Sequence, residues 1–294
     1  MAKLENRYKK TIDEISLLKE KLANKSFIIT VGNYKGGAGK TTNVTLIAYT
    51  LARLGIKTLV VDMDPQSNAT KSLMLTRSAN EEKKLSGINK TLMAAVQDGT
   101  LKDISVEIID NLYLLPSFID FADFPQYLYQ TYQDAKDRDF VFKTLLDEIK
   151  DDYQIILLDT PPMSKEMTRN SAIASDYVLI SLQTQEKSLT GAENYIKQLI
   201  ELMDEYNLNL DILGFLQVLY KNNGTVDEYI MESAKEIFGI ENIFKTIVPQ
   251  MERIKRFDIN GITDNDMHDN KVLNLFLKVT LEFLNRLVEL ESEK

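Results

Sequence analysis

The sequence contains no cysteine and a single histidine, and each shortage excludes a class of site. Without cysteine there is no disulfide framework and no Cys-ligated zinc or iron–sulfur cluster. One histidine also excludes a multi-His metal centre, and the polar neighbours of His268 predict a solvated loop residue. Thiolate and multi-histidine metal chemistry are therefore ruled out.

Long apolar runs are missing as well. No stretch approaches the roughly 18 to 20 uninterrupted apolar residues of a membrane-spanning helix, and residues 1–5 lack the apolar core of a secretion signal. We therefore expect a cytoplasmic protein. The net charge of −9 argues against a protein that coats nucleic acid over its whole surface, but it allows a local basic patch.

Short apolar runs recur between helical patterns, which is typical of parallel βαβ units. They cover residues 27–31, 58–61, 112–115, 155–158, 177–180 and 213–216. The 294 residues suffice for one large α/β domain or two small ones, but no linker rich in Pro, Gly or Ser divides them. We predict a single doubly wound, mostly parallel sheet with helices on both faces, built from residues 26–294.

The two ends of the chain have helical patterns. Residues 1–25 predict an amphipathic helix with apolar positions mostly three and four apart, at Leu4, Ile12, Ile15, Leu18 and Leu22. It would pack on its own domain or on a partner. The apolar segment Val272–Leu290 ends in acidic residues, whereas a membrane-surface helix carries Lys and Arg. This favours docking on the sheet or on a second subunit.

The run KGGAGKTT, Lys35–Thr42, lies between the first apolar run and the helix-like residues 44–48. Glycines let backbone N–H groups close around an anion, and the helix that follows points its positive end at that anion. Lys40 adds a mobile charge, and Thr41 adds a hydroxyl ligand for Mg²⁺. The sequence therefore predicts a nucleotide phosphate site rather than a glycine-rich turn.

The loop is a variant. The usual pattern G-x-x-x-x-G-K-[ST] would have its first glycine where this chain has Tyr34, and the chain has an additional lysine, Lys35.

Carboxylates follow two of the predicted strands, at the sheet edge where ligands gather in open α/β folds. Asp159 precedes Thr160 and two prolines, and it would hold Mg²⁺ directly or through water. Asp62 and Asp64 end another strand. A lone aspartate at such a position is more often a helix cap or a turn residue. Together with a lysine-bearing phosphate loop, both motifs are candidate site elements.

Four segments together resemble the ParA-type partition ATPases, within the deviant Walker A group of P-loop NTPases. They are KGGAGKTT at Lys35–Thr42, DMDPQSNAT at Asp62–Thr70, LLDTPP at Leu157–Pro162 and IVPQMERIK at Ile247–Lys255. The first segment alone also fits MinD-like and nitrogenase-iron-protein-like ATPases, but the set is specific. The resemblance covers most of the chain, from about residue 26 to the C-terminal helix.

The resemblance implies that ATP is bound with Mg²⁺ between two copies of the chain. Lys35 would reach across this sandwich homodimer to the partner's phosphates, Lys40 would hold the β- and γ-phosphates, and Thr42 would contact the α-phosphate. The rest of the implied nucleotide-binding loop is Gly36, Gly37, Ala38, Gly39 and Thr41.

The resemblance also implies catalytic and metal-binding roles. Lys35, Lys40 and Asp64 would be catalytic, with Asp64 orienting or activating the attacking water, and Thr41 and Asp159 would bind Mg²⁺. Phosphoryl transfer requires mainly positioning and charge neutralisation, and a lysine acting in trans is similar to an arginine finger.

The sequence indicates fewer residues for the end of the site that would bind the adenine of ATP. Pro249 matches the family's loop beside the adenine. Lys221 stands where relatives often carry Asp, and Gln250 and Met251 replace more usual polar residues. The contacts to base and ribose therefore stay open.

The leading functional hypothesis is a nucleoid-associated ATPase that moves or positions plasmid or chromosomal DNA. By resemblance, ATP drives dimerisation, the dimer binds DNA without sequence preference, and a centromere-binding adaptor protein triggers hydrolysis. The candidate DNA contacts are Lys245, Arg253, Lys255 and Arg256. A MinD-like membrane-associated positioning ATPase is the alternative, but a basic amphipathic tail is absent. A metabolic P-loop enzyme would need a second substrate pocket, which no motif marks.

Overall fold

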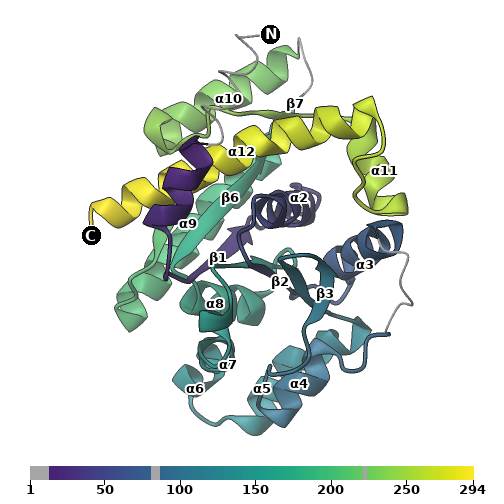
Figure 1. The fold of residues 1–294 in the computed structure, drawn as a ribbon. Coiled ribbons are helices and arrows are strands. Elements are labelled where there is room, and N and C mark those ends of the chain that lie inside the picture. Colours follow the sequence, from purple (N-terminus) through teal and green to yellow (C-terminus); the bar gives the residue numbers. More distant parts are fainter. Residues whose placement is uncertain (1–12, 81–86, 221–223) are drawn as a thin grey trace.

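β1 (Phe27–Gly32) is buried along its whole length and pairs in parallel with a strand on each side. In the computed structural model, which describes residues 13–80, 87–220 and 224–294, it lies inside one sheet of order β3-β4-β2-β5-β1-β6-β7-β8 (Figure 1). The other strands are β2 (Thr58–Asp62), β3 (Val106–Ile109), β4 (Leu112–Leu115), β5 (Ile155–Asp159), β6 (Tyr177–Gln183), β7 (Asp211–Tyr220) and β8 (Val248–Pro249). Only the β3–β4 pair of this sheet is antiparallel, so the predicted mostly parallel sheet is confirmed.

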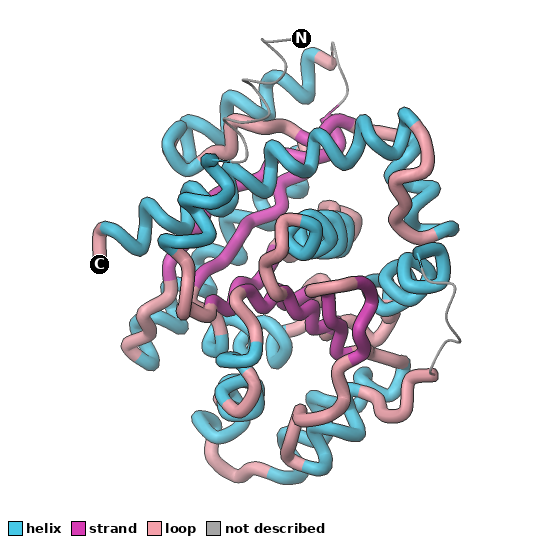
Figure 2. Tube along the Cα trace, in the orientation of Figure 1, coloured by secondary structure: helices cyan, strands magenta, loops and turns pink. Residues whose placement is uncertain are grey.

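Helices cover both faces of the sheet, as Figure 2 shows. They are α2 (Lys40–Arg53), α3 (Asn68–Asn80), α4 (Leu92–Asp98), α5 (Phe124–Thr131), α6 (Ala135–Asp139), α7 (Val141–Asp147), α8 (Lys165–Ala174), α9 (Glu186–Tyr206), α10 (Thr225–Phe238), α11 (Glu252–Asn260) and α12 (Met267–Ser292). The described residues also form short 3₁₀ helices at η1 (Ile119–Asp123), η2 (Lys150–Asp152) and η3 (Ile240–Asn242).

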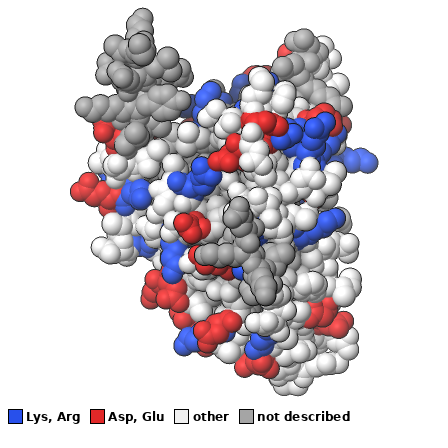
Figure 3. All heavy atoms as spheres, turned by 45° about the vertical axis from the view of Figure 1, so that its right-hand side comes forward, with Lys and Arg blue, Asp and Glu red and all other residues white. Residues whose placement is uncertain are grey.

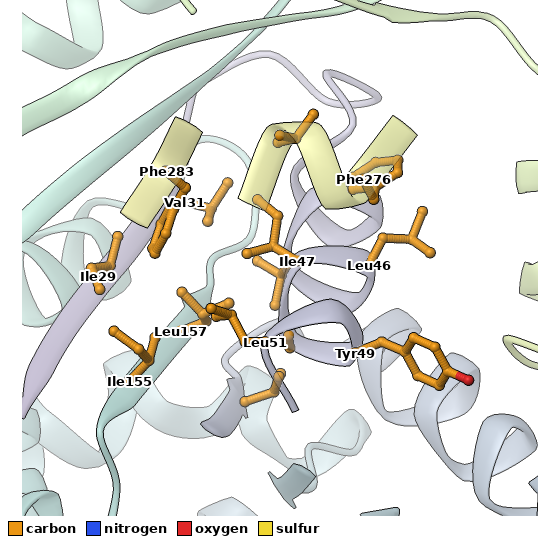
Figure 4. Packing of buried hydrophobic residues seen from close by; sticks show 14 of the residues in the cluster. Ile29, Val31, Leu46, Ile47, Tyr49, Leu51, Ile155, Leu157, Phe276 and Phe283 are labelled. Carbon is orange, nitrogen blue, oxygen red and sulfur yellow. The ribbon is translucent and has the colours of Figure 1, made fainter. Parts of the chain in front are cut away.

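Alternating side chains of the strands divide the core between the two faces. Ile29 and Val31 of β1 pack with α2 and α12, whereas Ile28 belongs to the cluster that includes residues of α4, α5, α7 and α8. Figure 4 shows the first cluster, where Ile47 of α2 and Phe283 of α12 meet the sheet. Because both faces are buried, the central strands have the near-continuous apolar sequences from which they were predicted.

All six predicted apolar runs are strands, but two further strands were not predicted. β3 lies in the polar stretch between residues 76 and 111, and most of its side chains are half-buried or exposed. β8 has only two residues. Both occupy the edges of the sheet. An edge strand that is short and partly solvated lacks a strong apolar pattern.

α12 docks on its own domain. Val272, Phe276, Val279, Phe283 and Leu287 are buried in the cluster shared with α2. Of the two predicted alternatives, docking on the sheet or on a second subunit, the structure shows the first.

His268 was predicted in a loop, which is wrong: it lies in the first turn of α12. Asp266 caps that turn by accepting hydrogen bonds from the backbone N–H groups of His268 and Asp269.

No helix among the described residues is long and apolar enough to cross a membrane.

The described part of the N-terminal segment, helical over residues 13–21, also packs on this domain. Leu18 and Leu22 are each 3% exposed and belong to the α2–α12 cluster. The Lys19 ammonium donates to the carbonyl oxygen of Leu54 at 3.1 Å, and Lys25 forms a 2.9 Å ion pair with Glu291. Leu4 and Ile12 lie outside the described residues, and the proposed boundary at residue 25 stays a prediction.

Replacing Leu18 by alanine is expected to lower the melting temperature by about 5–15 °C, because deleting a buried leucine costs roughly 2–5 kcal/mol. Leu17→Ala is the matched control, since Leu17 lies on the same helix and is 52% exposed. Differential scanning calorimetry measures both. Equal melting temperatures for the two variants would mean that this helix does not stabilise the domain in solution.

Candidate active site

The loop between β1 and α2, residues 33–39, has the backbone shape of a phosphate cradle. Gly37 and Gly39 have φ angles of 73° and 80°, a region that L side chains rarely adopt. Space is also short at Gly39, where a Cβ would lie 3.2 Å from Cγ2 of Val218. Gly39 is the N-cap of α2 and has no side chain to cap it. The first N–H groups of α2 are therefore available to an anion.

Lys40, the first residue of α2, is 6% exposed. Its ammonium donates to the carbonyl oxygens of Asn33 at 3.0 Å and Lys35 at 3.3 Å. Burial lowers the pKa of Lys40, while the nearby Asp159 and Asp64 carboxylates oppose that shift. The loop thus holds a buried cation with two carbonyl groups that an incoming anion can replace.

Thr41 and Asp159 form the expected hydroxyl–carboxylate pair. Thr41 Oγ1 donates to Asp159 Oδ2 at 2.8 Å, while the buried Oδ1 atom has no hydrogen-bond partner among the described residues. Burial and the neighbouring Asp62 raise the pKa of Asp159 to about 8, against the effect of the Thr41 hydrogen bond and Lys40. A buried oxygen without a partner is costly. A divalent cation with oxygen ligands fits this pair.

The two aspartates that follow β2 have different roles. Asp62 is fully buried, and its Oδ2 accepts hydrogen bonds from the backbone N–H and the hydroxyl of Thr70. Its Oδ1 accepts from the backbone N–H of Asp64 at 3.1 Å. Burial raises the pKa of Asp62 to about 6. Asp62 therefore fixes the loop, whereas Asp64 is half-buried and lines the cavity described next.

A cavity of about 490 Å³ lies on the phosphate loop. The loop residues Gly36 to Thr42 line it together with Asp64, and so do Val218 and Leu219 at the end of β7. The carboxyl ends of several parallel strands therefore face one cavity, as expected for a ligand site in an open α/β sheet.

The Pro249 segment borders the same cavity. Val248, Gln250 and Met251 line it, which places the residues on either side of Pro249 at its wall. Lys221 lies outside the described residues. The adenine contact of Pro249 stays a prediction.

One face of α11 lines this cavity, which the sequence did not predict. The cavity is lined by Met251, Ile254, Lys255 and Asp258. Counted from Met251, the other three follow after three, four and seven residues, which is the spacing of one helix face. Gln66, which precedes α3, and Asn68, the first residue of α3, line it as well. The helical spacing was visible in the sequence, but without the tertiary arrangement it did not indicate which side of α11 faces a ligand.

The four candidate DNA contacts have different surroundings. Arg253 is held in ion pairs with Asp266 at 2.7 Å and Asp269 at 2.5 Å, and its side chain is 21% exposed. Lys255 lines the cavity and pairs with Glu252 at 2.7 Å. Lys245, Lys255 and Arg256 are all exposed. On the face shown in Figure 3, basic and acidic side chains are interspersed. Their part in DNA binding stays a prediction.

Lys35 is half-buried, and its side chain is bound within its own chain. Its ammonium donates to the carbonyl oxygen of Gly36 at 3.0 Å and to Oε1 of Gln183 at 3.1 Å. Gln183 is the last residue of β6, and no motif in the sequence indicated it as a site residue.

A lysine-bearing glycine loop between a central parallel strand and a helix, facing a Thr–Asp pair, defines a P-loop nucleoside triphosphatase. A family profile described as "AAA domain" matches residues 26–212. Together with the partition relatives below, it shows that the chain belongs to the ParA/Soj family of partition ATPases.

The chromosome-partitioning ATPase Soj of Treponema pallidum is 30% identical over 233 residues, which is 78% of this chain and 85% of the relative. A plasmid partition protein from Borrelia burgdorferi, solved bound to AMPPNP, has a TM-score of 0.67 at 23% identity, covering 87% of this chain and 98% of that one. Cobyrinic acid a,c-diamide synthase from Mycobacterium smegmatis, solved with ADP and magnesium, has a TM-score of 0.66 at 24% identity. The match covers 80% of this chain and 90% of that one. These two structures show the shared fold.

Proposed function

We propose that this protein hydrolyses ATP to drive DNA partition and that it works as a nucleotide-sandwich homodimer. The observation that carries the proposal is the single cavity that joins the phosphate loop, Asp64 and the residues around Pro249. Partition relatives at about 30% identity support the biological role.

In this proposal the loop N–H groups and Lys40 bind the phosphates of ATP. Lys40 exchanges the carbonyl oxygens of Asn33 and Lys35 for phosphate oxygens. Thr41 and Asp159 hold Mg²⁺, which supplies charge neutralisation between the phosphates when it is bound. The Asp159 oxygen that has no partner and the adjacent Thr41 hydroxyl support this assignment.

Asp64 orients the attacking water. Its Oδ1 accepts the backbone N–H of Gln66 at 2.8 Å, so that its carboxylate has a fixed position at the cavity wall. Lys35 supplies positive charge to the phosphates of the partner subunit. Hydrolysis then depends on dimerisation, because each site is complete only with the second copy.

The ATP-bound dimer binds DNA without sequence preference at the nucleoid, and a centromere-binding adaptor protein stimulates hydrolysis and release. A MinD-like membrane cycle is less well supported, because Val272, Phe276, Val279, Phe283 and Leu287 of α12 are buried in the core of its own domain.

Retention on a non-specific DNA duplex tests the cycle. With ATP, ADP or no nucleotide, across a salt series, we expect salt-sensitive retention only with ATP. Nucleotide-independent retention, or ATP-dependent binding to liposomes in place of DNA, would contradict the partition proposal.

Charge reversal at two neighbouring residues of α11 should separate nucleotide binding from DNA binding. Lys255→Glu is expected to weaken ATP binding by roughly 3- to 10-fold, because it places a negative charge on the cavity wall. Arg256→Glu, the matched control, should leave ATP affinity unchanged. It should reduce by about one the slope that relates the logarithm of the DNA-binding constant to the logarithm of the salt concentration. Isothermal titration with ATP and DNA retention across salt measure the two effects. Equal effects of both variants on ATP affinity would contradict this assignment of Lys255.

A further inference from the structure

The side chain of Lys35 closes a ring of hydrogen bonds with three other residues. The Lys35 backbone N–H donates to Asn33 Oδ1 at 2.8 Å, and Asn33 Nδ2 donates to Ser188 Oγ at 3.3 Å. Ser188 Oγ also accepts the backbone N–H of Gln183 at 3.0 Å, and Gln183 Oε1 accepts the Lys35 ammonium at 3.1 Å. Backbone and side chain of Lys35 are therefore both attached to the junction of β6 and α9.

The inner part of this ring is rigid. Asn33 is 2% exposed, and its amide also donates to the carbonyl oxygens of Ser181 at 2.9 Å and Ser188 at 3.1 Å. Ser188 is fully buried. A buried polar group that lost these partners would cost free energy, so Asn33 and Ser188 hold one arrangement.

A glycine permits α9 to approach the loop. A Cβ at Gly191 would lie 2.7 Å from Asn33 Oδ1 and 3.3 Å from the backbone nitrogen of Lys35. This close approach brings the start of α9 against Lys35.

The outer part of the ring can open. Lys35 and Gln183 are both half-buried, and Gln183 lines a second cavity of about 330 Å³ that shares Leu219 and Gln250 with the nucleotide cavity. An amide oxygen is a neutral acceptor, whereas phosphate oxygens carry charge and bind an ammonium more strongly. The Lys35–Gln183 bond is therefore the part of the ring that phosphates can replace.

We propose that Gln183 is a positioning residue that keeps the Lys35 ammonium in its own subunit until the phosphates held by a second copy of the chain compete for it. The inference rests on the proposed role of Lys35 in trans. Gln183 then sets how readily ATP-bound subunits dimerise: a weaker acceptor favours the dimer, and a charged acceptor opposes it.

Two substitutions of similar size should shift dimerisation in opposite directions. Gln183→Met removes the acceptor oxygen, and Gln183→Glu replaces it with a carboxylate. In sedimentation experiments with AMPPNP, the protein concentration for half-dimerisation should fall for Gln183→Met and rise for Gln183→Glu, each by on the order of tenfold. A purely structural role would make both substitutions damaging in the same direction.

Gln185 provides the matched control, because it is exposed and lines the same second cavity. Gln185→Met and Gln185→Glu should leave dimerisation within about twofold of the wild type. Thermal unfolding of all four variants checks that they are folded. Shifts of equal sign for the Gln183 pair, no shift, or an equal effect of Gln185→Glu would overturn the inference.

Lys35→Ala separates this inference from the proposed function. If Lys35→Ala dimerises and hydrolyses ATP like the wild type, the role of Lys35 in trans fails. If Lys35→Ala loses dimerisation while the Gln183 pair has no effect, only the role of Gln183 fails.

Discussion

Replacing Lys40 by alanine is expected to weaken ATP binding by roughly 100-fold, because the ammonium makes charge-assisted hydrogen bonds to the phosphates. The protein should remain folded. Burial lowers the pKa of Lys40, so its charge is held in the loop at a desolvation cost that alanine does not carry. Fluorescence titration with a labelled ATP analogue, combined with thermal unfolding, measures both properties.

Lys35→Ala is the matched control for Lys40→Ala, since it removes an identical charge from the same loop. We expect it to bind ATP but to lose nucleotide-driven dimerisation or turnover. Unchanged ATP affinity in Lys40→Ala would remove the assignment of the phosphate site, and equal losses of affinity in both variants would contradict the separate roles of the two lysines.

Replacing Asp64 by alanine should lower the rate of ATP hydrolysis by about 10²- to 10⁴-fold, because the group that positions the water is lost. ATP should still bind, since Lys35, Lys40 and the Thr41–Asp159 pair remain. The ATP-bound dimer should then persist. Phosphate release gives the rate, and size-exclusion chromatography with ATP gives the lifetime of the dimer.

Asp64→Asn tests whether the carboxylate charge or the shape of the loop matters. Asparagine retains an oxygen that can accept the Gln66 N–H, so the loop should keep its conformation. Slow hydrolysis in both variants supports the role of the charge. Wild-type turnover in Asp64→Asn with slow turnover in Asp64→Ala would instead indicate that Asp64 only shapes the loop.

The four candidate DNA contacts show that charges close together in the sequence need not share one surface of the fold. Lys245, Arg253, Lys255 and Arg256 are close in sequence. On α11, however, Arg253 and Arg256 are three residues apart and share one side of the helix, whereas Lys255 lies on another side. Arg253 turns toward Asp266 and Asp269, Lys255 lines the nucleotide cavity, and Arg256 is exposed. Residues that are consecutive on a helix lie about 100° apart, so sequence proximity does not make a patch.

The sequence by itself determined the strand–loop–helix unit around Lys35–Thr42, the buried strands and the strand-end aspartates. These features follow from local requirements: glycine for a close approach to an anion, apolar runs for strands buried on both faces, and carboxylates where parallel strands end. The tertiary structure alone decided which residues far apart in sequence face one another. Gln183 meets Lys35 because the order of strands in the sheet brings β6 beside β1. The Lys255 side of α11 lines the same cavity as the phosphate loop, although β8, the strand before α11, lies at the edge of the sheet. Strand order depends on packing between distant segments, and no local pattern in the chain encodes it.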